Sequence, residues 1–265
     1  MGTHYLDLVD GRLAYELAGP ADGRLVVCVH GMGDTRRTFR FLVPQLAAAG
    51  HRVAAMDVRG YGESSVGWPD YSIASVGADL VALIRHLGGP AVAVGHSIGC
   101  GAALWAGAQA PENVTGLVLI GTSSGDRPVK AWMKPTARLV ARSPTLWGMY
   151  YRSLYPTANP ADLDIYVKDL KTNLREPGRI ATLRAQITEA LAGVKLRYCD
   201  VGCPALVVMG TKDSDVSDPA AEANLVANKL ASHARVELIE DAGHYPHAEM
   251  PDPTANAILK FLVDA

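Results

Sequence analysis

The sequence has no large charge surplus and few cysteines, and each shortage excludes a class of protein. Its 265 residues carry 25 Lys and Arg against 27 Asp and Glu, a formal net charge of −2. Without a basic surplus, we expect no binding to nucleic acid or to an anionic membrane surface. The cysteines follow no zinc or redox spacing, so we expect no metal site and reduced thiols. They are Cys28, Cys100, Cys199 and Cys203.

Long hydrophobic runs, internal repeats and low-complexity tracts are also missing from the sequence. The segment from Met1 to Asp7 has no basic region followed by an apolar stretch, and no other run approaches the length of a membrane span. We therefore expect a cytoplasmic protein that is not exported and does not enter a membrane. Its expected partner is a small-molecule substrate bound in a local site, and its expected state is a monomer or homodimer.

Short β-rich segments alternate with helical segments along much of the chain. The β-rich segments are almost entirely apolar, which is typical of strands buried on both faces of a sheet. They span residues 25–29, 52–56, 91–94, 114–120, 205–209 and 236–239. This alternation predicts an α/β fold with a mostly parallel sheet that helices cover on both sides.

Several helices have recognisable ends or faces. Asp218-Pro219 and Asp252-Pro253 each place a capping carboxylate before a proline suited to the first helical position. A third helix is predicted by an apolar stripe at i, i+3, i+4 and i+7 that ends before Gly88. Its members are Leu80, Leu83, Ile84 and Leu87.

The alternation stops between residues 123 and 202, where no buried-strand pattern is found and aromatic, methionine and proline residues become frequent. We expect an all-helical cap here, inserted into a core made of residues 1–122 and 203–265. Asn159-Pro160 is expected to open one of its helices. A second helix is predicted by the spacing of Ile180, Leu183, Ile187 and Leu191.

The segment Gly95-His96-Ser97-Ile98-Gly99 connects a predicted buried strand to a helix rich in small residues. This strand–turn–helix context is the one that a nucleophilic serine requires, and a bare G-x-S-x-G pattern without it would be weak. The glycines are needed where a side chain would collide with the strand or the helix. Ser97 is therefore the candidate nucleophile, and the Ile98 N–H is a candidate donor to developing negative charge.

Another predicted strand is followed by His30-Gly31-Met32-Gly33. The Met32 N–H is a candidate second donor in an oxyanion hole, although an ordinary strand-to-helix turn explains the pattern equally well. For His30 we expect a structural role in holding the loop.

A carboxylate and a histidine follow two later strands, at Asp213 and His244. The resulting order of serine, acid and histidine matches the arrangement of a hydrolase triad, in which the acid orients the histidine that acts as general base. Asp215 is the main rival for the acid, and Asp126 is a second one. Asp218 is better placed to cap a helix.

Together these segments resemble the α/β-hydrolase family. The residues that carry the resemblance are His30-Gly31-Met32-Gly33, Asp57-x-Arg59-Gly60-x-Gly62-x-Ser64, Gly95-His96-Ser97-Ile98-Gly99, Gly210-x-x-Asp213 and Gly243-His244-x-Pro246-His247-x-Glu249-x-Pro251. The chain is most similar to compact bacterial members with a helical cap, a group of esterases, lactonases, carbon–carbon bond hydrolases and cofactor-free haloperoxidases. The resemblance implies a Ser97–His244–Asp213 triad, an oxyanion hole at Met32 and Ile98, and no cofactor. Cys100 departs from the glycine common at that position.

We therefore expect a serine hydrolase that cleaves a carboxylic ester or related acyl bond of a small apolar or aromatic substrate. Lactonase, carbon–carbon bond hydrolase and thioesterase activities would use the same triad. A ligand receptor on the same fold is the alternative of another class. Among the cap aromatics we expect Trp132, Trp147 and Tyr151 to contact the substrate.

Overall fold

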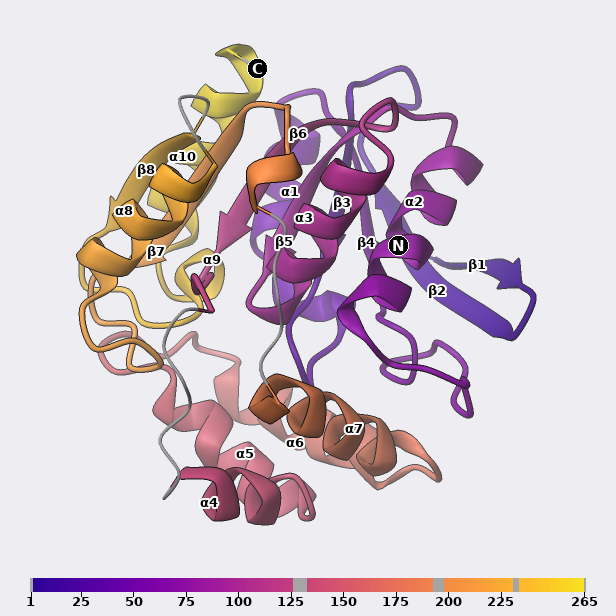
Figure 1. Ribbon diagram of the computed structural model, residues 1–265, viewed down its shortest axis with the longest axis vertical. Coiled ribbons are helices and arrows are strands. Elements are labelled where there is room, and N and C mark those ends of the chain that lie inside the picture. Colours follow the sequence, from indigo (N-terminus) through magenta and orange to yellow (C-terminus); the bar gives the residue numbers. More distant parts are fainter. Residues whose placement is uncertain (1, 126–132, 193–197, 231–233, 265) are drawn as a thin grey trace.

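A computed structural model describes residues 2–125, 133–192, 198–230 and 234–264 of the chain. Its centre is an eight-stranded sheet with the strand order β1-β2-β4-β3-β5-β6-β7-β8 (Figure 1). The strands are β1 (Thr3–Leu8), β2 (Gly11–Ala18), β3 (Leu25–Val29), β4 (Arg52–Met56), β5 (Ala91–His96), β6 (Val114–Ile120), β7 (Ala205–Gly210) and β8 (Ala234–Ile239).

The six strands from β3 to β8 are all paired in parallel, which confirms the predicted mostly parallel sheet. Every residue of β3, β5 and β7 is buried, because helices cover both faces of the sheet. β8 is half exposed, as its position at one edge of the sheet allows.

β1 and β2 form an antiparallel hairpin that the sequence did not predict, and β2 also pairs antiparallel with β4. β1 has no buried residue, so it lacks the apolar run that marked the other strands. The hairpin extends the sheet on the side away from β8 and does not carry any candidate site residue.

Helices pack against both faces of the sheet. On one face, α2 (Ile73–His86), α3 (Ile98–Gln109) and α8 (Pro219–Lys229) contribute to one apolar core with alternate residues of the strands. On the other face, α1 (Leu42–Ala48) and α10 (Pro251–Asp264) complete a second core. The short helices η1 (Arg36–Phe39) and α9 (Pro246–Glu249) lie in loops that follow β3 and β8.

The predicted helix signals are confirmed in two helices and corrected in a third. Leu80, Leu83 and Ile84 on α2 are fully buried. Asp218 caps α8 by accepting a hydrogen bond from the Ala221 N–H at 3.0 Å. Asp252, in contrast, is not a cap, because α10 already begins at Pro251 and the Asp252 carboxylate accepts a hydrogen bond from Gln45 at 3.0 Å.

Between β6 and β7 the described residues contain helices and loops but no strand, and we call this part of the chain the insertion. Its helices are α4 (Met133–Val140), α5 (Pro144–Ser153), α6 (Leu163–Arg175), α7 (Arg179–Ala192) and η2 (Tyr198–Asp200). Helices α4 to α7 gather at one end of the molecule, below the sheet in Figure 1. α6 begins at Leu163 and not at Pro160. The division into core and cap at residues 123 and 202 stays a prediction.

No helix in the described ranges combines the length and the apolar character that crossing a membrane would require.

Candidate active site

Ser97 occupies the junction between β5 and α3 in a strained backbone conformation. Its φ of 53° and ψ of −121° lie in a region that residues with a side chain rarely adopt. A Cβ atom on Gly95 would lie 2.5 Å from the Gly99 carbonyl oxygen, and one on Gly99 would lie 2.3 Å from the Val29 carbonyl oxygen. Glycine is therefore required on both sides of Ser97, as the sequence argument predicted.

The loop after β3 packs directly on Ser97. A Cβ atom on Gly31 would lie only 3.1 Å from the Ser97 Cβ, so the backbone that leads into Met32 packs against the serine. Among the hydrogen bonds of the described residues, neither the Met32 N–H nor the Ile98 N–H is a donor. Ile98 is the first residue of α3, where backbone N–H groups have no partner within the helix and the helix dipole favours an anion.

His244 and Asp213 form a buried pair at the ends of β8 and β7. The His244 Nδ1–H donates to Asp213 Oδ2 at 2.8 Å, and the two residues are only 5% and 3% exposed. The second oxygen, Oδ1, accepts a hydrogen bond from the Asp215 N–H at 2.9 Å. Both carboxylate oxygens are thus used, which fixes the carboxylate and the ring that it orients.

Backbone contacts on both sides hold the His244 loop in place. The His244 N–H donates to the Leu154 carbonyl oxygen at 3.1 Å, and the buried His96 ring donates from Nε2 to the His244 carbonyl oxygen at 3.0 Å. Oε1 of Glu249 accepts from the N–H groups of both residues that flank His244, at 2.9 and 3.3 Å. Burial raises the pKa of this carboxyl group to about 7.

The surroundings of His244 favour its charged form. Burial opposes the charge, but the Asp213 and Asp215 carboxylates outweigh it and raise the pKa of His244 to about 9. For Asp213, burial would raise the pKa, but the attraction and hydrogen bond of His244 lower it below its usual value. The pair is therefore electrostatically matched, with a positive imidazolium facing an ionised carboxylate.

Ser97 lies next in sequence to His96, whose ring centroid is 4.9 Å from that of His244. The hydrogen bonds of the described residues do not include one between the Ser97 hydroxyl and His244. Such catalytic hydrogen bonds are often long before substrate binds and tighten in the complex. The structure brings the predicted serine, histidine and acid to the same edge of the sheet.

The rival acids are placed differently. Asp215 Oδ2 lies 3.7 Å from Nε2 of His244, so it approaches the opposite nitrogen from Asp213. Asp126 falls outside the described residues, as does the predicted substrate contact Trp132.

Trp147 and Tyr151, both on α5, pack against the loop that carries Met32. Trp147 donates from Nε1 to the Gly33 carbonyl oxygen at 3.0 Å and is 5% exposed. Tyr151 has no exposed surface, and its hydroxyl donates to Asp34 Oδ2 at 3.1 Å. This placement favours a packing role for Tyr151. A substrate contact by Trp147 stays a prediction.

Two features of the site have no counterpart in the sequence motifs. The buried Asp34 accepts hydrogen bonds from Tyr151 and Tyr166, 117 and 132 positions later in the chain. The Tyr150 hydroxyl contacts both oxygens of Asp215 at 3.0 Å. Each pairing joins the insertion to a core loop, and no local pattern indicates such a contact.

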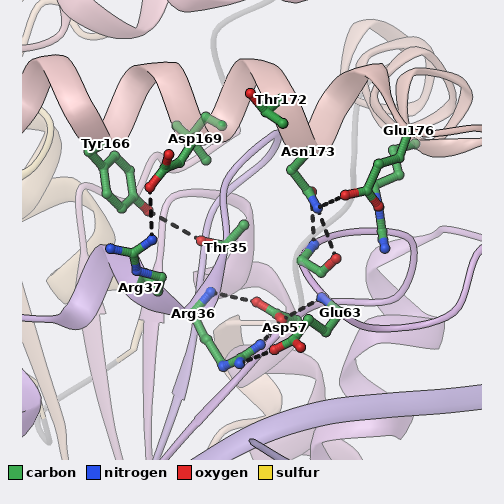
Figure 2. A pocket seen from close by; sticks show the side chains of 13 residues that line it. Thr35, Arg36, Arg37, Asp57, Glu63, Tyr166, Asp169, Thr172, Asn173 and Glu176 are labelled. Atoms are coloured by element: carbon green, nitrogen blue, oxygen red, sulfur yellow. Dashed lines mark hydrogen bonds and ion pairs between the residues drawn. The ribbon is translucent and has the colours of Figure 1, made fainter.

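A cavity of about 400 Å³ lies between α6 and the loops after β3 and β4, but its lining does not include Ser97, Asp213 or His244 (Figure 2). Its charged side chains are already paired, as in the 3.0 Å contact between Arg37 and Asp169. No three His, Cys, Asp or Glu side chains within the described ranges are arranged to hold a metal ion.

Comparison with known sequences finds relatives along nearly the whole chain. The chain is 27% identical over 282 residues to the sn-1-specific diacylglycerol lipase ABHD11 from Mus musculus, which covers 98% of this chain and 88% of that protein. A relative from Variovorax paradoxus matches at 38% identity over 130 residues, which is 47% of this chain and 44% of that protein.

Solved structures share the fold. A hydrolase from Pseudomonas aeruginosa superposes with a TM-score of 0.81 at 26% identity and covers 98% of both chains. The enol-lactonase from Burkholderia xenovorans LB400 gives a TM-score of 0.83 at 20% identity, covering 98% of this chain and 100% of its own, a likeness of fold alone. A family model described as the alpha/beta hydrolase family matches residues 26–257. The chain belongs to the α/β hydrolase family.

Proposed function

We propose that this α/β hydrolase cleaves a carboxylic ester or related acyl bond through an acyl-enzyme on Ser97. In this proposal His244 is the general base, Asp213 orients and stabilises its ring, and the Met32 and Ile98 N–H groups bind the developing oxyanion. The substrate class is a small molecule with an apolar or aromatic acyl group, because Trp147 of the insertion packs beside the loop carrying Met32.

The proposed reaction has two halves. His244 Nε2 takes the Ser97 proton as the hydroxyl oxygen attacks the acyl carbon, and the same proton is then given to the leaving-group oxygen. A water molecule next attacks the acyl-enzyme, gives its proton to Nε2, and releases the acid as Ser97 recovers its hydroxyl proton. Asp213 stays ionised throughout and stabilises the imidazolium.

The strained backbone of Ser97 is the observation that carries this proposal. A serine with a φ of 53° between a buried strand and a helix costs about 1–3 kcal/mol, and such strain is found mainly where function requires it. It aims the serine at the sheet edge where the His244–Asp213 pair also lies. Lactones, thioesters and certain carbon–carbon bonds are cleaved by the same chemistry and stay alternatives for the substrate.

Replacement of the nucleophile tests the proposal. We expect Ser97→Ala to lose more than about 99% of the turnover of a short p-nitrophenyl ester, while its thermal unfolding stays near that of the wild type. We also expect a fluorophosphonate to label Ser97. A purified variant that keeps more than about a hundredth of the rate, with host esterases excluded, would contradict the proposal. A single stoichiometric burst in the wild type would favour a ligand receptor.

A further inference from the structure

His244 has a second carboxylate on the nitrogen opposite Asp213. Asp215 Oδ2 lies 3.7 Å from His244 Nε2, the nitrogen that faces the substrate in the proposed reaction. The Asp215 side chain is 37% exposed, whereas that of Asp213 is 1% exposed. A group that enters the site from solvent therefore meets Asp215, whereas Asp213 is covered.

A tyrosine of the insertion fixes the position of Asp215. The Tyr150 hydroxyl, on α5, lies 3.0 Å from each Asp215 oxygen and donates its proton to the carboxylate. Burial, followed by the Asp215 charge, raises the pKa of Tyr150 well above its usual value, so the hydroxyl stays protonated and available as a donor. The carboxylate is thus held beside His244 by a contact between the insertion and a core loop.

His244 is the neighbouring group that can balance the charge of Asp215. Within the described ranges, the ion pairs of Asp215 do not include a lysine or arginine, and its one charged contact is with His244. The local potential beside Nε2 is therefore negative when His244 is neutral, which is the state required of a general base. Fields of this kind discriminate between charged ligands over several ångströms.

The leaving group is the part of the substrate that comes nearest to this carboxylate. Nε2 delivers a proton to the leaving-group oxygen, so that oxygen must come within hydrogen-bond reach of Nε2. Because Asp215 lies 3.7 Å from the same atom, a charged group that is separated from the leaving oxygen by two carbon atoms comes within several ångströms of the carboxylate.

We propose that Asp215, positioned by Tyr150, is a specificity-determining residue that selects substrates with a cationic or neutral leaving group over those with an anionic one. This inference rests on the proposed function, because it uses the direction in which Nε2 acts. The ligand class that fits best is an ester of an amino alcohol or alkylammonium alcohol. An ester of a hydroxy acid, whose leaving group carries a carboxylate, is repelled.

Three acetate esters that share the acyl group and differ in leaving-group charge test this inference. The alcohols are choline, its neutral isostere 3,3-dimethylbutanol, and 3-hydroxypropanoate. We expect the wild type to show a higher kcat/KM for the cationic ester than for the anionic ester, and Asp215→Asn to reduce that ratio about tenfold. High salt should shrink the wild-type ratio, because ions screen an exposed carboxylate.

Glu237→Gln is the matched control, because it removes one negative charge from the exposed face of β8, away from the site. Its ratio should stay within about twofold of the wild-type value. Tyr150→Phe keeps the ring and removes the donor, so it should lower the ratio by a smaller factor than Asp215→Asn. An unchanged ratio in both Asp215→Asn and Asp215→Ser, with normal thermal unfolding, would overturn the inference.

Binding to Ser97→Ala separates this inference from the proposed function. The three esters are titrated into Ser97→Ala by calorimetry, with and without Asp215→Asn, and the ratio of Kd values should change about tenfold even though no turnover is needed. If the wild type hydrolyses no ester but this ratio changes, the proposed function fails and the charge selection stands. If turnover depends on Ser97 and neither ratio depends on Asp215, only the charge selection fails.

Discussion

At the scale of single residues, His244 is set between two carboxylates, and this predicts an alkaline pH profile. The Asp213 and Asp215 charges overcome burial and raise the pKa of His244 to about 9, with a smaller contribution from Glu249. A general base must be neutral to accept a proton, so its active fraction grows as the pH rises toward that pKa.

We therefore expect kcat/KM for a neutral ester to rise from pH 6 and to level off only above a midpoint of about 9. Removing one carboxylate should lower the midpoint, so Asp215→Asn should reach its plateau at a lower pH than the wild type. The measurement is kcat/KM against pH with an ester that does not ionise in this range. A midpoint near 6.5 in the wild type would contradict the assignment.

The two candidate acids can be separated by amide substitution. Asp213 accepts from Nδ1 at 2.8 Å and fixes the tautomer, whereas Asp215 faces Nε2 at 3.7 Å. We expect Asp213→Asn to lower kcat by about 10⁴, as an amide does in a related triad, and Asp215→Asn to have a much smaller effect on a neutral ester. Steady-state kcat values of the two variants on that ester distinguish the two acids. A larger loss of kcat in Asp215→Asn than in Asp213→Asn would assign the role of the acid to Asp215.

The sequence predicted the candidate residues that depend on local pattern or chain order. Ser97 stands in a strand–turn–helix motif, and Asp213 and His244 follow it in a fixed order, so one sequence was enough to nominate them. Tyr150 was not nominated as the partner of Asp215, because that contact depends on how the insertion folds back onto a core loop 65 positions away in the chain.

At the scale of elements, the close packing of α3 on β3 determines where Ser97 lies. A Cβ atom on Gly99 would lie 2.3 Å from the Val29 carbonyl oxygen, which is a backbone atom of a fully buried strand. We expect Gly99→Ala to lower the free energy of unfolding by about 3 kcal/mol or more, and to lower activity as the helix shifts from Ser97.

Gly107 provides the control in the same helix. A Cβ atom there would make ordinary contacts at 3.5 Å and beyond, and alanine favours the helix interior, so Gly107→Ala should be neutral or stabilising by about 0.5–1 kcal/mol. Denaturant unfolding of the two variants measures both values. Equal effects of the two substitutions would mean that contact with β3 does not decide the position of α3.

Strands with a mostly apolar sequence were predicted from the sequence, whereas the β1–β2 hairpin was not. β3 and β7 consist of apolar residues alone or nearly so, because both sides of each strand are covered by helices. The β1–β2 hairpin was missed because β1 is exposed or half-buried throughout and resembles a loop in composition. The start of α6 was misplaced because Asn159-Pro160 leads into a turn, in which the Leu163 N–H donates to the Pro160 carbonyl oxygen at 2.9 Å, and the α-helix begins only after that turn.

At the scale of the whole molecule, the insertion meets the core through two different surfaces. Near His244 the contact is aromatic, because Tyr151 and Tyr155 pack with Tyr245 in one buried cluster. Farther along α6 the contact is polar and lines the cavity, and Asn173 points from the helix to Gly62 in the loop after β4, accepting from its N–H at 3.1 Å and donating to its carbonyl oxygen at 2.9 Å (Figure 2). The aromatic surface is the stronger anchor, because burial of apolar rings stabilises more than exposed ion pairs do.

Arg40, in the loop after β3, holds the start of α6 to the core, and it gives a way to test whether α6 opens independently of the sheet. Its guanidinium donates from Nε and Nη2 to the two oxygens of Asp162 at 2.6 Å, and the two side chains are 13% and 39% exposed. Loss of this two-bond contact should cost about 1–2 kcal/mol locally. We expect Arg40→Gln to speed amide hydrogen exchange in α6 about 5- to 30-fold and to leave β5 and β6 unchanged.

Arg85→Gln is the matched control for that experiment. It removes the 2.9 Å ion pair between Arg85 and Glu112, two residues outside the insertion. Their side chains are 60% and 63% exposed. Exposed pairs of this kind contribute little to stability, so exchange in α6 should not change. If Arg40→Gln speeds exchange in β5 and β6 as much as in α6, then the insertion and the sheet open as one unit. In that case α6 would not open independently of the site, because β5, the strand that leads into Ser97, would open with it.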